Sequence, residues 1–246
     1  MSSASPDLPR HLQLMWELDD GTRRGPKPKL TIGDIGATAA AIADDQGLDA
    51  VSMKAIADRL DVTPMSLYRY VEAKEDVYDV MFDEAYGSPD PALLDGLDTW
   101  RDRLTAWALA VTDRMVAHPW VTALPMTRPP AGPRTLRWTD VGIAAFDGTR
   151  LPDAQRLSIL LLVSGFLRNH VRMSADMGAF EPDRPSSADH YNAVLGHVID
   201  EQRYPNLTRA VRGDFADDDE NFFTDELRVG LDLILDGVAA RIAADG

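Results

Sequence analysis

The stretch from residue 52 to residue 70 constrains the fold more than any other, because it predicts two short helices joined by a tight turn. The first follows Ser52, whose hydroxyl is placed to cap it, and ends before a turn at residues 61–62. The second opens with Thr63 as N-cap and Pro64 as its first residue, where a missing N–H costs nothing, and it is expected to run to about Tyr70. This pattern matches a helix-turn-helix, whose second helix lies in the major groove of DNA.

The rest of the chain is also predicted to be helical. Apolar residues at helical spacing predict a helix over 31–46, which Gly47 ends, and another over 74–86. Beyond the GSPDP sequence at 87–91, the predicted helices are 99–117, 132–146, 153–176, 188–203 and 226–244. Proline and glycine mark the breaks between them, and no alternation typical of a strand occurs. The sequence therefore predicts an all-α protein.

Three regions follow from these segments. Residues 1–29 mix proline, glycine and charge, and they predict an N-terminal arm that is partly ordered at best. Residues 30–86 form the predicted helix-turn-helix domain, and residues 92–246 form a larger helical domain. A chain of 246 residues is long enough for both domains to bury a core.

The charge of the chain is distributed unevenly. The formal net charge is -15, which by itself disfavours a nucleic-acid partner, because phosphates are neutralised by Lys and Arg. Between positions 22 and 74, however, eight basic residues face seven acidic ones, so this segment is close to neutral. The distribution is compatible with a small basic reading surface on an otherwise acidic molecule.

The run AIADDQGLDAVSMKAIADRLDVTPMSLYRYVEAKEDVYDVM at 41–81 resembles the tetracycline-repressor (TetR) family without gaps. The positions that carry the resemblance are Ala39 to Gly47, Ser52, Ala57 to Val62, Leu67, Tyr68 and Lys74. One departure is Asp61, where the family usually has glycine in the turn. Aspartate tolerates the left-handed region better than most residues, so we expect the turn to form.

The recognition helix is expected to bury Leu67 and Val71, which are four residues apart, and to turn its other side toward the groove. Arg69 is suited to pair with guanine, and Pro64 and Met65 to touch a thymine methyl group. The full set of predicted DNA-binding residues is Ser52, Lys54, Thr63, Pro64, Met65, Tyr68, Arg69 and Lys74.

The resemblance adds roles for several of these residues. It implies that Ser52, Tyr68 and Lys74 bind phosphates, and that Lys54 reaches either the backbone or a base edge. The basic stretch TRRGPKPK at 22–29 is either an arm that reaches DNA or a solubilising tail. The plainer alternative for the whole surface is a solvated charged face.

The C-terminal part resembles the same family more weakly, through HPW at 118–120, RPPAGP at 128–133, the helix at 153–176 and VGLDLILDGV at 229–238. The resemblance implies a homodimer whose interface is a four-helix bundle of residues 153–176 and 226–242 from each subunit. The residues assigned to the two stripes are Leu157, Leu160, Leu161, Ser164, Gly165 and Arg168, and Leu227, Leu231, Ile234, Leu235 and Val238. Such a dimer would read a near-palindromic operator, with half-sites about 34 Å apart or a multiple of that.

The resemblance also implies a pocket for a small-molecule effector in the C-terminal domain. The candidate lining residues are Trp107, Met115, His118, Trp120, Trp138, Phe166, Asn169, His170 and Met173. They suit a largely apolar ligand with a few polar contacts, although aromatic residues at helical spacing more often belong to the core. Binding would favour a conformation with the wrong spacing between recognition helices, transmitted through the helix at 74–86. Repression is the usual sign of regulation, and activation is the alternative.

Other classes of function find little support. An enzyme would need a constellation of reactive groups, and the acidic run at 214–226 and the histidines at 118, 170, 190 and 197 lack convincing spacing. The acidic run is interpreted as a solvated loop, and neither a metal nor a cofactor is predicted. A helical interaction protein that has lost DNA binding is a further alternative. Without cysteine, a secretory signal or a membrane-length apolar segment, the chain is expected to be cytoplasmic.

Overall fold

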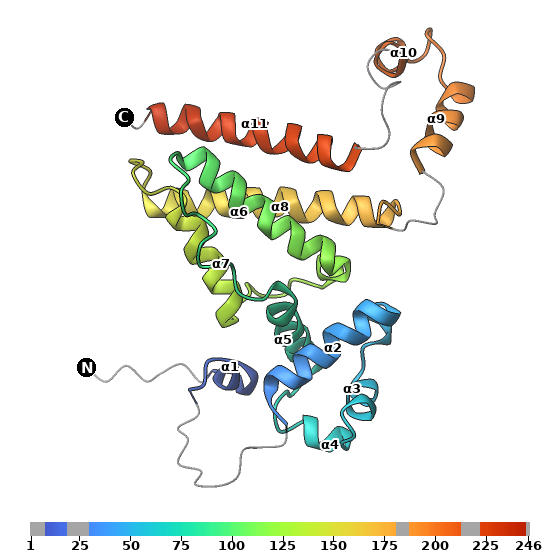
Figure 1. Ribbon diagram of the computed structural model, residues 1–246. Coiled ribbons are helices and arrows are strands. Elements are labelled where there is room, and N and C mark those ends of the chain that lie inside the picture. Colours follow the sequence, from blue (N-terminus) through green and yellow to red (C-terminus); the bar gives the residue numbers. More distant parts are fainter. Residues whose placement is uncertain (1–7, 19–29, 181–186, 213–221, 245–246) are drawn as a thin grey trace.

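The structure, a computed structural model, describes residues 8–18, 30–180, 187–212 and 222–244. Every regular element in these ranges is a helix, which confirms the predicted all-α fold (Figure 1). No helix in the described part of the chain is both long enough and apolar enough to cross a membrane.

Helix α2 (Ile32–Gln46) has the bounds that the sequence predicts, and local hydrogen bonds fix both ends. The Thr31 hydroxyl accepts from the Asp34 N–H at 3.1 Å, and the Asp34 carboxylate accepts from the Thr31 N–H at 2.7 Å. This reciprocal capping box satisfies N–H groups that have no partner inside the helix. Gly47 follows the helix with a φ of 84°, in the left-handed region that favours glycine.

The helix-turn-helix forms as predicted, apart from the length of its second helix. Helix α3 (Met53–Arg59) is capped by the Ser52 hydroxyl, which accepts from the Ala55 N–H at 3.1 Å. Asp61 occupies the turn with a φ of 53°, so this aspartate does take the left-handed conformation for which the family usually uses glycine. The turn therefore survives the departure from the family pattern.

Helix α4 (Pro64–Leu67) is only four residues long, so the prediction that it runs to about Tyr70 was wrong. The chain after Leu67 continues as a tight turn, in which the Tyr70 N–H donates to the Leu67 carbonyl at 2.8 Å. The Tyr70 hydroxyl donates to the Leu30 carbonyl at 2.8 Å. This bond holds the end of the turn against the start of the domain, so the chain bends back instead of extending the helix.

Helix α5 (Lys74–Tyr86) has the predicted bounds and packs closely along α2. A Cβ atom on Gly36 would lie 2.6 Å from Val80 Cγ1, so only glycine permits this approach of the two helices. In Figure 1, α5 stands between the helix-turn-helix and the C-terminal helices. It is therefore the main structural link between the two halves.

The C-terminal half is built around one long helix. Its elements are α6 (Trp100–Ala117), a 3-10 helix η2 (Pro119–Ala123), α7 (Pro133–Ala144), α8 (Asp153–Asp176), α9 (Ser187–Val198), α10 (Pro205–Arg212) and α11 (Phe222–Ala244). Helix α8 contacts η2, α6, α7 and α11, and α11 lies beside it in Figure 1. The predicted bounds of α8 are confirmed.

Three of the predicted C-terminal elements need correction. Helix α9 ends at Val198 and not near residue 203, and a separate helix, α10, opens at Pro205, where proline suits a first helical position. Helix α11 begins at Phe222, so the end of the acidic run at 214–226 is helical and not a loop. Residues 214–221 of that run lie outside the described residues.

The N-terminal region holds a helix that the sequence interpretation did not identify. Helix α1 (Arg10–Met15) lies against α2 and α5. His11 is fully buried beneath it, and the exposed Trp16 donates from Nε1 to the Ala131 carbonyl at 2.8 Å. Residues 8–18 of the predicted arm are thus docked on the body, whereas the basic stretch at 22–29 lies outside the described residues.

Candidate DNA-binding surface and effector region

The residues predicted to contact DNA bases are Pro64, Met65, Tyr68 and Arg69, and they form an exposed ridge above buried core side chains. Leu67 and Val71 are fully buried, as predicted, and anchor α4 and the following turn in the core. Met65 is 74% exposed and Tyr68 is 50% exposed. Pro64 and Arg69 are exposed as well. The exposed side chains are therefore of kinds that can contact the edges of DNA bases, while the buried Leu67 and Val71 contribute to the stability of the domain.

Polar residues flank this ridge at the starts of helices. Ser52 and Thr63 are both exposed N-cap residues. The Thr63 hydroxyl makes no capping bond, since it lies 3.0 Å from the Ser66 hydroxyl, so its predicted N-cap position is right but its side chain does not cap. The two lysines of the predicted set, Lys54 and Lys74, are exposed, and the Lys74 Nζ lies 5.3 Å from the centre of the Tyr78 ring.

The positive charges of this surface differ in how far they are neutralised. Arg59 is paired with Asp45 at 2.8 Å, and both side chains are about half exposed. Within the described ranges, no carboxylate forms an ion pair with Lys54, Arg69 or Lys74. These three cations therefore remain available for phosphates or bases, despite the acidic character of the whole chain.

A buried carboxylate joins α5 to α7. Asp83 is 1% exposed, and it accepts from the backbone N–H and the hydroxyl of Thr135, each at 2.8 Å. Because Thr135 lies in the first turn of α7, Asp83 satisfies a donor that has no partner inside that helix. Arg134 adds an ion pair with Glu84 at 2.5 Å. The end of α5 is thus fixed to the start of α7.

A second polar contact joins α2 to η2. Asp44 Oδ1 accepts from Trp120 Nε1 at 2.6 Å and lies 2.9 Å from His118 Nδ1. Both His118 and Trp120 are among the predicted effector-lining residues. Their polar atoms face the DNA-binding half, so these two side chains contribute to the junction between the halves.

Three other predicted lining residues form a buried group. Trp107 donates from Nε1 to the Trp138 carbonyl at 2.8 Å, and Trp138 donates from Nε1 to the Gly87 carbonyl at 2.9 Å. Met115 is 2% exposed on the same helix as Trp107. The two indoles thereby tie α6 to α7, and α7 to the residue that follows α5.

The remaining predicted lining residues lie on α8, away from that group. His170 Nε2 lies 2.9 Å from the Phe223 carbonyl, and Phe166 lies beside the His170 ring, with centroids 5.9 Å apart. Asn169 and Met173 are exposed and contact each other. The structure therefore distributes the nine candidates over three places and does not gather them around one space.

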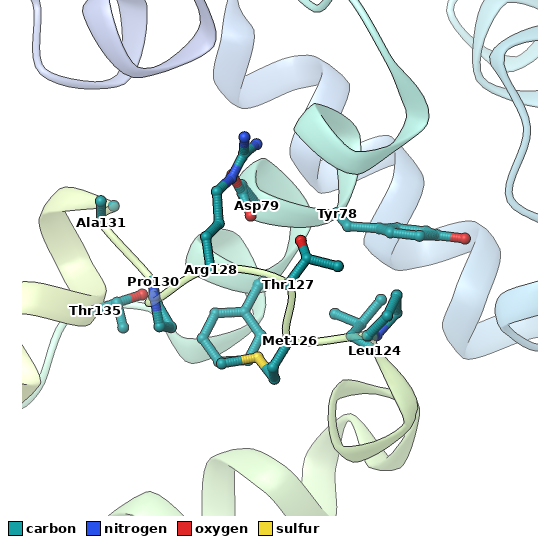
Figure 2. Close-up of a pocket in the computed structure, with 12 residues that line it drawn as sticks. Tyr78, Asp79, Leu124, Met126, Thr127, Arg128, Pro130, Ala131 and Thr135 are labelled. Atoms are coloured by element: carbon teal, nitrogen blue, oxygen red, sulfur yellow. The ribbon is translucent and has the colours of Figure 1, made fainter. Parts of the chain in front are cut away.

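A cleft lies elsewhere, between α5 and the loop that precedes α7 (Figure 2). It is lined by Tyr78, Asp79, Phe82, Leu124, Pro125, Met126, Thr127, Arg128, Pro130, Ala131, Gly132 and Thr135. Its cavity of about 20 Å³ has room for about one water molecule. None of the nine candidates lines it. The RPPAGP sequence could have pointed to this loop, but it was interpreted only as a helix break.

A charged cluster lies at one side of this cleft. Arg128 donates to Asp79 at 2.8 Å and to Asp76 at 3.0 Å, and Figure 2 shows its side chain extending toward Asp79. His11 of α1 lies within 3.2 Å of Asp76 and 3.1 Å of Asp79. Burial acts to raise the pKa of Asp76, but hydrogen bonds from the Glu72 N–H and Arg128, with the nearby His11, bring that pKa below its usual value.

The faces of α8 and α11 differ from the predicted stripes. Most of the stripe on α11 is buried in its own subunit: Leu227, Leu231, Leu235 and Val238. Leu160 is buried too, and Arg168 donates to the Leu124 carbonyl at 2.7 Å and so points into the subunit. The large apolar residues left exposed are Leu157, Leu161, Leu162 and Met173 on α8, Met177 directly after it, and Val229 and Leu233 on α11. A free apolar face therefore exists, but α11 contributes a different side to it.

The described residues contain no group of three or more His, Cys, Asp or Glu side chains suited to hold a metal ion.

Comparison with known families gives two matches. Residues 35–81 match the family described as bacterial regulatory proteins, tetR family. Residues 91–242 match the family described as the tetracyclin repressor-like C-terminal domain.

Individual proteins agree with these matches. The chain is 30% identical over 249 residues to the HTH-type transcriptional repressor DrrR1 of Streptomyces coeruleorubidus, covering 98% of this chain and 89% of that protein. A possible TetR family transcriptional regulator from Streptomyces coelicolor A3(2) has a TM-score of 0.66 and 25% identity, over 85% of this chain and 98% of that one. The structure of the Streptomyces coelicolor TetR family protein ActR in complex with actinorhodin has a TM-score of 0.71 and 23% identity. The match covers 89% of this chain and 99% of that one.

Proposed function

Because this chain belongs to the TetR family of transcriptional regulators, we propose that it represses transcription by binding a near-palindromic operator as a homodimer. As a member of this family it is a DNA-binding regulator and not an enzyme. The observation that carries the proposal is the exposed ridge of α4 and the turn after it, where Met65, Tyr68 and Arg69 are exposed around fully buried Leu67. An exposed arginine beside exposed apolar side chains suits a major groove, where it can pair with guanine while they contact thymine methyl groups.

The DNA-binding residues have separate roles in this proposal. Arg69 pairs with guanine, and Met65 and Pro64 contact thymine methyl groups. The residues that bind phosphates are Ser52, Lys54, Thr63, Tyr68 and Lys74, with Lys54 and Thr63 also able to reach a base edge. Phosphate contacts position the protein, and the few base contacts give sequence preference.

Dimerisation through α8 and α11 is supported by the apolar residues that these helices leave exposed. Leu161 is 76% exposed and Leu233 is 68% exposed, although both lie on long, well-packed helices. Large apolar side chains exposed on two helices that contact each other are typical of an interaction surface. Two-fold pairing of this face would bring the two α4 ridges onto one side of a DNA duplex.

Release by a small molecule is the remaining part of the proposal. The support is the tight junction between the halves, in which Asp83 of α5 accepts from Thr135 of α7, and Asp44 of α2 accepts from Trp120 and lies 2.9 Å from His118 Nδ1. A ligand that displaces α7 or η2 would reorient the DNA-binding half through these bonds. ActR, with a similar fold, is known in complex with actinorhodin. The proposal divides the chain into residues 30–86 for DNA and 92–246 for the effector and the dimer. It places the protein with the chromosome in the cytoplasm.

Selection from a random pool of DNA duplexes, at low and moderate salt, tests this function. The expected result is a near-palindromic consensus whose half-sites repeat about 34 Å apart or at a multiple of that distance. Arg69→Ala should relax the preference at one position of each half-site and weaken binding about tenfold or more. Arg137→Ala is the matched control, because Arg137 is an exposed arginine of α7 paired with Asp140.

The opposite result is equally informative. If no sequence is enriched at either salt, and the purified protein carries no small molecule, the proposed DNA binding is wrong. The chain would then be a helical interaction protein that keeps the family fold.

A further inference from the structure

A short N-terminal segment, residues 8–18 with helix α1 at its centre, crosses the boundary between the two halves, and we call it the strap. On one side, His11 Nε2 lies 3.1 Å from Asp79 of α5. On the other side, Trp16 donates from Nε1 to the carbonyl of Ala131, in the loop that precedes α7, at 2.8 Å. Figure 1 shows α1 beside α2, close to where the halves meet, and Asp79 and Ala131 both line the cleft of Figure 2. The strap therefore contacts both halves.

The strap also covers an ion pair that joins the halves directly. Arg128, from the same loop as Ala131, donates to Asp79 at 2.8 Å and to Asp76 at 3.0 Å. His11 is fully buried beside both carboxylates, and the Asp76 side chain is only 11% exposed. Ion pairs that are shielded from water are screened by salt less than exposed ones. Docking of the strap thus strengthens the link between α5 and the loop.

Asp76 connects this cluster to the recognition element. Its Oδ1 faces the strap and Arg128, while its Oδ2 accepts from the N–H groups of Glu72 at 2.9 Å and Ala73 at 3.2 Å. Glu72 lies only three positions after Arg69, at the end of the turn that follows α4. A movement of the strap is therefore transmitted toward the ridge through one carboxylate.

The strap is held reversibly. Helix α1 is six residues long, and no side chain caps its N-terminus. Isolated helices of fewer than about 12 residues are marginal in water, so this one depends on its contacts with the body. His11 Nδ1 is buried without a hydrogen bond, which offsets part of the free energy gained on docking. Loss of the contacts at its ends should therefore release and unfold the whole helix.

We propose that residues 8–18 act as a detachable strap that fixes the angle of the DNA-binding half against the C-terminal half. In a dimer held together by α8 and α11, this angle determines the distance between the two ridges. A fixed angle reduces the conformational freedom that is lost when both ridges bind at once, so the docked strap favours operators of one half-site spacing. The inference rests on the proposed operator binding by a dimer and adds the element that sets the spacing. His11 and Trp16 are positioning residues, because they act through Asp76, Asp79 and Ala131 and not on DNA.

Hydrogen–deuterium exchange of the full-length protein tests whether the strap docks. The test variant is His11→Leu combined with Trp16→Phe, which removes the polar contacts on both sides and keeps apolar side chains. Amides of residues 12–16 should exchange at least about tenfold faster in this variant than in the parent. Trp100→Phe combined with His197→Leu is the matched control, since His197 is exposed and no described residue accepts a hydrogen bond from the Trp100 indole. Trp16→Phe alone should give the same change to a smaller extent.

The angle between the halves is measured without DNA. The chain has no cysteine, so Asp58→Cys on α3 and Asp140→Cys on α7, both at exposed positions, place one spin label in each half. Labelled protein is diluted with unlabelled protein, so that distances within one chain are recorded. The distance distribution should be at least about twofold broader in the strap variant than in the parent and the control.

Binding to DNA tests the consequence of a fixed angle. The operator found by selection is compared with duplexes whose half-sites lie one base pair closer together or farther apart. The strap variant should bind the selected duplex about fivefold more weakly than the parent, and its preference over the altered duplexes should fall severalfold. A variant that is merely less stable would instead lose affinity for all the duplexes equally.

Three results would overturn the inference, each taken from variants whose circular dichroism spectra match the parent. The first is exchange of the α1 amides that is as fast in the parent as in the strap variant. The second is a released α1 with an unchanged distance distribution. The third is a spacing preference that the strap variant keeps in full. If selection yields no operator, the proposed function fails, whereas the exchange rates and the label distances still decide whether the strap fixes the angle.

Discussion

The helix caps of the DNA-binding half and the polar contacts that join it to the C-terminal half differ in how far along the chain they reach. In the first group, the caps join residues three apart, such as Thr31 with Asp34 and Ser52 with Ala55. In the second, the indole of Trp120 bonds a carboxylate 76 residues away. The first kind of contact is encoded within one turn of helix, and the second exists only after the halves have packed.

This difference explains which predicted roles agree with the structure. Exposure along residues 64–69 agrees with the predicted helical spacing, although α4 itself ends at Leu67: Leu67 is buried and Arg69 is exposed, as predicted. Aromatic residues at helical spacing were assigned to an effector pocket, yet Trp107 and Trp138 bond backbone carbonyls in the core. Spacing predicts which side of a helix is apolar, but it does not predict what that side meets.

The largest expected effect tests whether distant contacts hold the two halves together. Asp83→Ala removes the buried acceptor of Thr135 and leaves donors at the start of α7 without a partner. The free energy of unfolding should fall by about 3 kcal/mol, measured by urea denaturation. Asp140→Ala, at an exposed pair with Arg137, should cost less than about 1 kcal/mol. Equal effects of the two substitutions would remove the distinction between the contacts that join the halves and local pairs.

A second test concerns the Trp120 contact. Trp120→Phe keeps an aromatic ring but deletes the donor to Asp44, and we expect a loss of about 1.5 kcal/mol in the free energy of unfolding. Trp100→Phe is the matched control, because no described residue accepts a hydrogen bond from the Trp100 indole. If the control costs as much as Trp120→Phe, ring packing and not the hydrogen bond holds this part of the junction.

A third test addresses the DNA-binding half, where roles should be local and separable from stability. Lys74→Ala should weaken binding to all duplexes by about 1 kcal/mol and lower the salt dependence of binding by about one counterion. Its melting temperature should stay close to that of the parent, because Lys74 is exposed. A sequence-dependent loss would show that Lys74 reads a base and not a phosphate.

The smallest expected effect concerns the cluster under α1. Because hydrogen bonds lower the pKa of Asp76 in the folded protein, its contribution is complete above the unfolded-state pKa and is lost as the pH falls through the folded-state value. Asp76→Asn should therefore flatten the fall in the free energy of unfolding below about pH 4. The measurement is urea denaturation across this range, with Asp140→Asn as the control. If the free energy of unfolding of Asp76→Asn falls with pH as steeply as that of the parent, this carboxylate does not contribute to the acid sensitivity.

The same distinction determines how much of the site could be predicted. The residues proposed to bind DNA carry a family pattern and local periodicity, so each could be proposed from the sequence, and the structure shows that all of them are exposed. Arg168 was assigned to the dimer stripe because it follows the helical spacing of Leu157 and Leu161. Its side chain turns inward because the Leu124 carbonyl lies within reach, a fact that depends on how α8 packs on η2.

The sequence by itself determined the family, the all-α fold, the ends of α2, α5 and α8, and the exposed ridge of α4. These features depend on caps, turns and spacing that act between residues no more than about four apart. The tertiary structure alone decided the docking of α1, the partners of the tryptophans, the burial of the α11 stripe and the cleft beside Arg128. Each of these depends on which distant backbone and side-chain groups packing brings within hydrogen-bond distance, and no local pattern specifies that.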